Sequence, residues 1–196
     1  MGSSSSQTIG YRYFFGIHMG LCRGPVDQLV AIKVGDRVAW TGNITGNASF
    51  KIAEGELFGG DKGEGGIVGW VDVMMGGSSQ AVNTDLAAML GGTVPAFRGV
   101  CSLFYDGQIS SFNPYPKPWA VRVRRATAGW DGTVWNSADA VISLESNAIR
   151  AMNPAHIVYA VLTNRDWGRG LSASHLDLDA FGEAADPSLA EGLGPS

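Results

Sequence analysis

Apolar and polar residues follow a two-residue period over much of the first 130 positions, which is typical of β-strands with one face in a core. Residues 29–34 and 37–42 flank Gly35-Asp36, a pair of turn-forming residues, and this predicts a β-hairpin. The aromatic stretch 11–23 contains Gly16 and Gly20, which favours a strand that is buried on both faces or bulged at a glycine. Further strands are predicted over 48–53 and 67–75.

Two more strand regions follow, and the first contains a turn signal. Residues 96–111 predict a strand, a turn at Asp106-Gly107 and a second strand. Residues 112–129 begin with a proline-rich run and then alternate between apolar and polar side chains. The alternation places Val121 and Val123 on one face of a strand and Arg122 and Arg124 on the other. Val134 and Trp135 are expected to close the sheet.

Helical patterns occupy two places. Residues 83–92 predict a short helix with Asn83 or Thr84 as its N-cap and Gly91-Gly92 at its end. After about residue 138 the period changes to that of a helix, with an apolar stripe built from two pairs four residues apart. These pairs are Ile157/Val161 and Val158/Leu162.

The start of that longer helix is well marked. Asn153 is a favourable N-cap and Pro154 occupies the first helical position, where its missing N–H costs nothing. The segment 164–168 is expected to end the helix. A second helix is predicted over 172–186, capped by Ser174 and with Asp177 in its first turn. Its inner stripe is expected to be Leu178, Phe181 and Ala185.

These patterns predict an α+β protein in which a β-rich body of antiparallel sheets, barrel-like or sandwich-like, precedes a short helical C-terminal part. We expect a flexible N-terminus at 1–10, a β-rich domain at 11–137 and a helical segment at 138–196. The 196 residues are 45% hydrophobic and 16% charged, which is sufficient for a folded core.

The charge and hydropathy of the chain argue against nucleic acids and membranes as partners. The net charge is −4 and the pI is about 5.3, so bulk electrostatics does not favour nucleic-acid binding. Apolar runs fall short of the ~20 residues of a membrane helix, and we expect no membrane insertion.

Few residues are arranged for chemistry. His18, His156 and His175 lie far apart and form no metal-binding motif with a cysteine or carboxylate, and His156 is expected to be neutral in the first turn of its helix. Cys22 and Cys101 are expected to be buried free thiols. We therefore expect no catalytic residues, no metal and no cofactor.

The glycine cluster at 59–66 resembles a phosphate-binding loop only at first sight. Lys62 follows Gly60 too closely for that motif, and the next segment is a strand, whereas a phosphate loop opens a helix. The pattern favours a hairpin tip. Asp61 and Glu64 are two carboxylates, which is too few for a metal site.

The sequence contains more residues suited to contacts with other proteins than residues suited to catalysis. Arg122, Arg124 and Arg125 form the one basic cluster, which is either a solvated sheet face or an ionic contact with an acidic partner. Tryptophans are enriched in contact surfaces, and the chain carries Trp119, Trp130, Trp135 and Trp167. The residues that we predict to form contacts are Trp119, Arg122 and Arg124, together with Gly60, Asp61, Lys62 and Glu64 of the loop.

Several phrases, in this order, resemble one protein family. They are "MGSSSSQTIGYRYFFGIHMGLCRGPVDQLVAIKVGDRVAW", "LFGGDKGEGGIVGWVDVMMGG", "NPYPKPWAVRVRR", "MNPAHIVYAVLTNRDWGRG" and "LDLDAFGEAAD". Together they are similar to the N-terminal part of tailed-phage central tail hub proteins, relatives of the tip attachment protein J of lambda-like phages. The resemblance implies a β-rich, homotrimeric virion protein that binds other tail proteins. It would be located in the virion tail, and in the host cytoplasm during assembly or expression from a prophage.

The chain departs from that family at its end. Family members are far longer and continue their helix after "FGEAAD", whereas this sequence reads "PSLAEGLGPS". Pro187 is expected to break or kink the helix. These features predict a truncated gene or a domain fragment.

Two alternatives remain open. A carbohydrate-binding or other ligand-binding β-domain would gather Trp119, Trp130 and Trp135 around one groove. A tail-associated cell-wall hydrolase would bring two carboxylates, or a cysteine and a histidine, together in a cleft.

Overall fold

The computed structural model describes residues 11–130, 141–143 and 150–191, and the chain divides into two compact units, residues 1–124 and 125–196. We describe each unit by itself.

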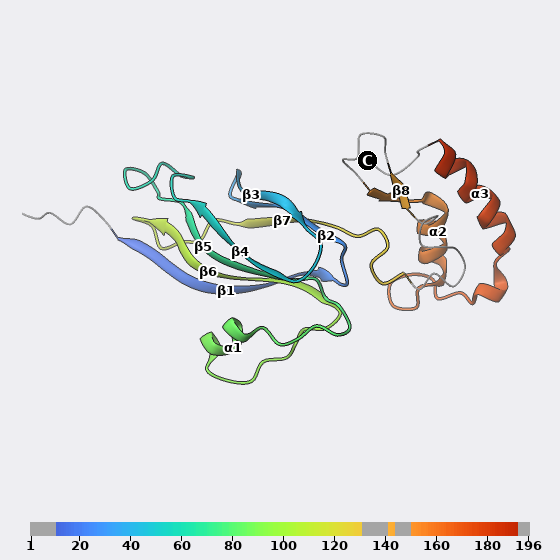
Figure 1. Ribbon diagram of the computed structural model, residues 1–196, viewed down its shortest axis with the longest axis horizontal. Coiled ribbons are helices and arrows are strands. Elements are labelled where there is room, and N and C mark those ends of the chain that lie inside the picture. Colours follow the sequence, from blue (N-terminus) through green and yellow to red (C-terminus); the bar gives the residue numbers. More distant parts are fainter. Residues whose placement is uncertain (1–10, 131–140, 144–149, 192–196) are drawn as a thin grey trace, which may run out of the picture. The chain divides into compact units, whose positions relative to one another are not determined.

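The N-terminal unit is built from two antiparallel sheets (Figure 1). The four-stranded sheet has the order β1-β6-β5-β4 and the three-stranded sheet has the order β3-β2-β7. The strands are β1 (Arg12–Arg23), β2 (Gln28–Val34), β3 (Arg37–Ile44), β4 (Ala48–Glu54), β5 (Ile67–Met74), β6 (Val100–Ser111) and β7 (Trp119–Arg124). The predicted hairpin is present as β2 and β3, and β1 is bulged next to Gly20.

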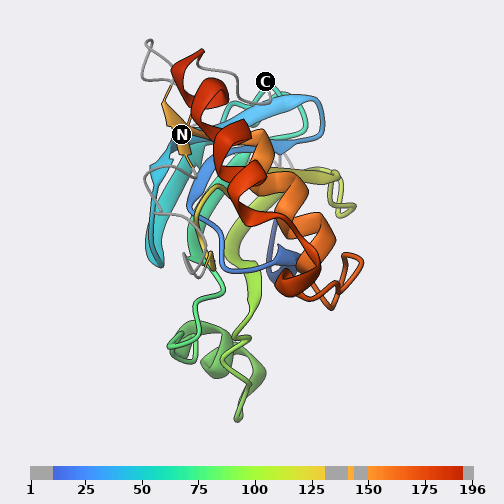
Figure 2. The same cartoon turned by 90° about the vertical axis from the view of Figure 1, so that its right-hand side faces the viewer.

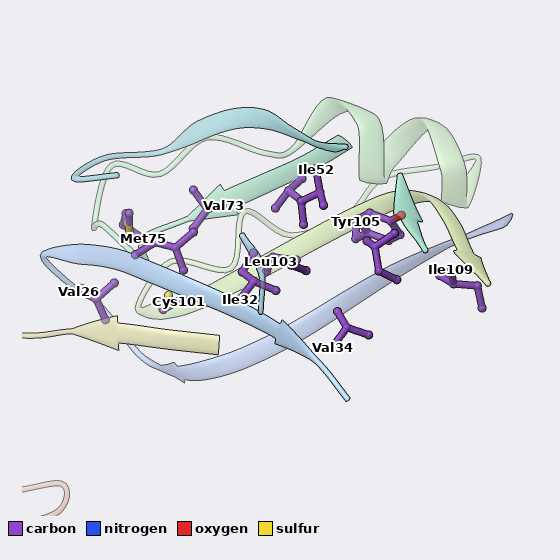
Figure 3. Packing of buried hydrophobic residues seen from close by; sticks show 14 residues of the cluster. Val26, Ile32, Val34, Ile52, Val73, Met75, Cys101, Leu103, Tyr105 and Ile109 are labelled. Carbon is purple, nitrogen blue, oxygen red and sulfur yellow. The ribbon is translucent and has the colours of Figure 1, made fainter. Parts of the chain in front are cut away.

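The core lies between these sheets (Figure 3). Both sheets contribute alternate side chains to it, as the two-residue period of a strand requires. Leu103 and Tyr105 of β6 and Ile32 of β2 are fully buried, with 0% of their surface exposed. The other buried members are Val26, Leu29, Val34, Ala39, Ile52, Ile67, Val71, Val73, Met75, Cys101 and Ile109. The unit is therefore a β-sandwich, and with the helices that follow it confirms the predicted α+β class.

β6 corrects one prediction. Asp106-Gly107 does not form a turn, because β6 is one continuous strand through both residues. β6 pairs with β1 on one side and β5 on the other, with Gly107 opposite Gly69. Two ladders of hydrogen bonds hold the Asp-Gly pair extended and override its local turn preference.

The short helix α1 (Thr84–Leu90) lies on the outward face of the four-stranded sheet (Figure 1). The Asn83 side chain accepts a hydrogen bond from the Leu86 N–H, and Gly91 ends the helix in the left-handed conformation, as predicted. Leu86 is buried in a second cluster with Met74, Val94 and Phe104. This cluster fixes α1 over one part of that face, and among residues 11–124 large side chains such as Trp70 of β5 stay exposed on it.

The C-terminal unit contains β8 (Val141–Ser143), β9 (Arg150–Met152), α2 (Pro154–Thr163), the short 3-10 helix η1 (Ala173–His175) and α3 (Leu178–Ala190). α2 and α3 lie side by side (Figure 2). Asn153 caps α2 as predicted, and its buried side chain also donates a hydrogen bond to the Ala185 carbonyl of α3 at 2.9 Å.

The second predicted helix differs in its limits. Ser174 belongs to η1, and Asp177 is the N-cap of α3, accepting a hydrogen bond from the Ala180 N–H at 3.1 Å. Pro187 does not break α3, which continues to Ala190. It lies in the last turn, where only one intrahelical hydrogen bond is lost, and the Ser188 hydroxyl donates to the Ala184 carbonyl beside it.

The buried face of α2 also differs from the prediction. Val158 and Val161 are 51% and 43% exposed, whereas His156 and Tyr159 are buried. The Tyr159 ring packs against Phe181 of α3 at 6.0 Å, so the aromatic side chain rather than the valine stripe determines the inner face. The predicted inner stripe of α3 is confirmed, with Ala185 buried and Leu178 and Phe181 half-buried.

The boundary between the units follows Arg124, earlier than the predicted limit at residue 137. β7 ends at Arg124 and is the last strand that pairs with β2, so sheet pairing sets the boundary. The predicted limit was placed at a change of hydrophobic period. That limit, and the predicted sheet closure by Val134 and Trp135, lie outside the described residues.

Candidate functional site

The glycine loop between β4 and β5 is fixed to the sandwich by ion pairs. Arg12 Nη2 lies 2.7 Å from Asp61 Oδ2, and Lys117 Nζ lies 2.5 Å from Glu64 Oε2. Asp61 raises the pKa of the Arg12 guanidinium by hydrogen bonding and by its charge. Two of the predicted contact residues therefore already bind cations of the same unit.

The tip of this loop is closed by a backbone bridge. Gly60 is paired with Gly65, and both adopt positive φ, 59° and 80°. Gly60 is buried, whereas Lys62 is exposed beside it. The segment joins two antiparallel strands, which confirms the predicted hairpin tip.

Trp119 belongs to the core more than to the surface. It is half-buried, and its ring centroid lies 4.9 Å from that of the buried Tyr105. Its indole therefore helps to join the two sheets.

Arg122 and Arg124 project from the outward face of the three-stranded sheet, while Val121 and Val123 pack against the core, which confirms the predicted alternation. The register places Arg122 opposite Ala31 and Lys33 opposite Ala120. Lys33, Arg122 and Arg124 thus share one surface, which we call the basic face. Arg124 also donates a hydrogen bond to Gln28 Oε1 at 3.2 Å.

A second surface, which is not among the predicted contact residues, lies on the outward side of the four-stranded sheet. Trp70 of β5 is 58% exposed and lies opposite Asp106 of β6 and Lys51 of β4. A recess of about 430 Å³ forms between this part of the sheet and α1. Its lining residues are Trp70, Asp72, Asp85, Ala88, Met89, Phe104 and Asp106. We call this surface the acidic face.

Three carboxylates converge on this recess from three elements. Asp72 comes from β5, Asp106 from β6 and Asp85 from the first turn of α1. Asp72 Oδ2 accepts a hydrogen bond from Asn83 Nδ2 at 2.8 Å, which ties the helix N-cap to the sheet. The recess can therefore accept a positively charged group beside an aromatic ring.

Only part of the acidic face could be predicted from the sequence. Alternation in 67–75 places Trp70 and Asp72 on one side of a strand. Because a turn was predicted at Asp106-Gly107, Asp106 was not expected on the strand next to Trp70 and Asp72. The position of Asp85 depends on how α1 packs, which a local pattern does not contain.

The two cysteines are direct partners across β1 and β6. Cys101 is buried as predicted, but Cys22 is exposed, because it lies at the end of β1 beyond the bulge. Burial raises the pKa of the Cys101 thiol to about 12, with smaller contributions from the charge and hydrogen bonding of Cys22.

His18 is also structural in its contacts. Its ring centroid lies 4.5 Å from that of Phe97, and burial lowers the pKa of its imidazole, which favours the neutral form. The exposed Cys22 thus has a second thiol, rather than a histidine, as its cross-strand partner.

The C-terminal unit contains an aromatic pocket of about 460 Å³. Trp130, Tyr159 and Trp167 contribute rings to its lining, and Trp167 is 51% exposed. Trp130 makes edge contacts with His156 and Tyr159, at centroid distances of 5.1 and 5.9 Å. Trp119 belongs to the other unit and Trp135 lies outside the described residues, so the groove of Trp119, Trp130 and Trp135 stays a prediction.

Among residues 11–130, 141–143 and 150–191, no three His, Cys, Asp or Glu side chains are grouped to hold a metal ion. In the same part of the chain, no helix has the length and apolar character needed to span a membrane.

No protein-family model matches the chain, and a search of curated proteins finds no matching relative.

Proposed function

We propose that the chain is a structural component of a phage or prophage tail tip, a hub protein that acts in tail assembly and host attachment through contacts with other tail proteins. The resemblance of its sequence phrases to central tail hub proteins motivates this proposal. The proposed role is structural and needs no catalytic residue, metal or cofactor.

The observation that carries the proposal is the uncovered acidic face. Phe14 of β1 and Trp70 of β5 are 64% and 58% exposed on the outward side of one sheet. Leu90 of α1, the helix that packs on this sheet, is 61% exposed. Large apolar side chains gathered with charged residues on one surface are typical of protein contacts.

Immunogold electron microscopy of purified particles tests this role. An antibody raised against the chain is expected to label the tail tip, and particles from a strain in which the gene is deleted provide the control. Fully assembled tails that lack the chain, although it is expressed in the same cells, would contradict the proposal.

The aromatic pocket of the C-terminal unit favours one alternative, a carbohydrate-binding module. Aromatic side chains with a few polar neighbours are suited to binding the apolar faces of sugar rings. Titration with cell-wall oligosaccharides, followed by tryptophan fluorescence, tests this alternative. Binding that Trp167→Ala weakens and Trp70→Ala leaves unchanged would favour the carbohydrate-binding module over a purely structural part.

A further inference from the structure

The two outward faces of the sandwich carry opposite charge. Strand positions on the outward side of the three-stranded sheet include the cations Lys33, Arg122 and Arg124. The outward side of the four-stranded sheet, with α1, carries the three carboxylates of the acidic face, and Lys51 lies opposite Trp70 on the same side. The faces point away from each other (Figure 1), so they cannot pair within one molecule.

The spacing of the charges matches between the faces. Asp72 is opposite Phe104 and Trp70 is opposite Asp106, so Asp72 and Asp106 are diagonal neighbours across β5 and β6. Lys33 is opposite Ala120 and Ala31 is opposite Arg122, so Lys33 and Arg122 stand in the same diagonal relation across β2 and β7. Diagonal neighbours of this kind are about 7–8 Å apart. Two cations can therefore meet two carboxylates at equal spacing.

The surroundings of the charges also fit together. Across β2 and β7, the residues directly opposite Lys33 and Arg122 are Ala120 and Ala31, and on the β3 side Lys33 lies opposite Val38. On the acidic face, the carboxylates surround a recess, with the exposed indole of Trp70 at its edge. A guanidinium that enters this recess meets carboxylates and can stack on the ring.

We propose that the acidic face of one copy of this chain binds the basic face of a second copy, with Lys33 and Arg122 against Asp72 and Asp106. The inference deepens the proposed tail-hub function, on which its biological role rests, by naming the partner of the uncovered face. The two surfaces differ, so the contact is heterologous and generates either a closed ring or an open chain.

Analytical ultracentrifugation of the full chain tests the contact. We expect the average mass to rise with concentration up to about 200 µM, which detects dissociation constants well above the micromolar range. The association should weaken at least about tenfold between about 50 mM and about 500 mM NaCl, because exposed charge pairs are screened. A chain that stays monomeric throughout would overturn the proposal.

Charge reversal then identifies the faces. Asp72→Lys with Asp106→Lys makes both faces basic, and Lys33→Glu with Arg122→Glu makes both faces acidic. Each double variant alone is expected to be monomeric, and a mixture of the two is expected to associate. Arg169→Glu, an exposed charge reversal outside both faces, is the matched control and should leave the wild-type association unchanged.

Circular dichroism of each variant confirms folding before the mass is measured. Association by either double variant alone at the wild-type level, or failure of the folded variants to associate when mixed, would overturn the assignment of the two faces. Trp70→Ala should weaken association by about tenfold if the indole receives the cation. Loss of tail labelling with intact self-association would reject only the tail role, and tail labelling without self-association would reject only this contact.

Discussion

Gly69 of β5 and Gly107 of β6 lie directly opposite each other. A Cβ atom on Gly69 would lie 2.4 Å from the Asp106 carbonyl oxygen and 2.8 Å from the Tyr105 hydroxyl. The Tyr105 side chain reaches over this glycine pair and donates a hydrogen bond to the Gln108 carbonyl at 2.5 Å. The glycines therefore provide the space in which a buried tyrosine satisfies its hydroxyl group.

Gly69→Ala is expected to lower the free energy of unfolding by about 1–3 kcal/mol, because the added methyl group overlaps backbone and hydroxyl atoms. Gly20→Ala is the matched control, since a Cβ at Gly20 meets no atom within 4 Å. Urea unfolding of the two variants measures the difference. Equal stability would contradict the close approach of the two strands.

The buried thiol of Cys101 is expected to make the free energy of unfolding fall as the pH rises above 9. Its thiol pKa rises from an ordinary 9.0 to about 12 in the folded chain, chiefly because it is buried. Between these values the unfolded chain binds fewer protons than the folded chain. The contribution is therefore complete below pH 9 and decreases by at most about 1.4 kcal/mol per pH unit as the pH rises toward 12.

Urea unfolding at pH 8, 9 and 10 measures this slope, with Cys101→Ala as the comparison. The wild type should lose stability more steeply than Cys101→Ala above pH 9. Tyr105, whose pKa burial also raises, contributes in the same direction to both proteins and cancels in the comparison. Parallel slopes would contradict the buried, protonated thiol.

At the scale of elements, the junction of α2 and α3 depends on one side chain. Asn153 is 0% exposed, accepts a hydrogen bond from the Ala155 N–H at 3.0 Å and donates one to the Ala185 carbonyl. It is therefore both the N-cap of α2 and a link to α3.

Asn153→Ala is expected to cost about 2–4 kcal/mol in the stability of the C-terminal unit, because it removes a cap and leaves buried backbone groups without partners. Asp177→Ala removes an exposed cap with one hydrogen bond and should cost only about 1 kcal/mol. Chemical unfolding of both variants gives the comparison. A smaller effect at Asn153 than at Asp177 would contradict its linking role.

The sequence predicted most elements where local pattern and pairing agree. The β2–β3 hairpin, the Asn153 cap and the outward direction of Arg122 all follow from short-range rules. Prediction failed where tertiary structure overrides local preference. Asp106-Gly107 is extended because strands flank it on both sides, and α3 retains Pro187 in its last turn.

The candidate contact surfaces also include one part that local pattern predicts and one part that depends on tertiary structure. Arg122 and Arg124 of the basic face were predicted, because they lie along one alternating strand, whereas Lys33 joins them from β2 only through the pairing of the two strands. The acidic face collects Trp70, Asp85 and Asp106 from three elements, and only the sheet order brings them together. Sheet order depends on pairing between residues far apart in the chain, which periodicity does not report.

On the scale of the whole molecule, the division after Arg124 predicts two separate responses to mutation. Gly69→Ala should increase hydrogen exchange in residues 11–124, and Asn153→Ala should increase it in residues 150–191. Mass spectrometry of peptic peptides measures both regions in one experiment. Equal changes in both regions from either substitution would contradict independent units.

The register of β1 has a consequence for synthesis on the ribosome. Arg12 pairs with Ser111, so β1 has its partner only after β6 has been translated. At about 5–20 residues per second, β1 waits about 5–20 s for that partner. The β2–β3 and β4–β5 hairpins can form meanwhile, because their strands are neighbours in sequence. During this interval β1 lacks the strand on which its apolar side chains pack, and a chaperone bound to it would protect those side chains from misassembly.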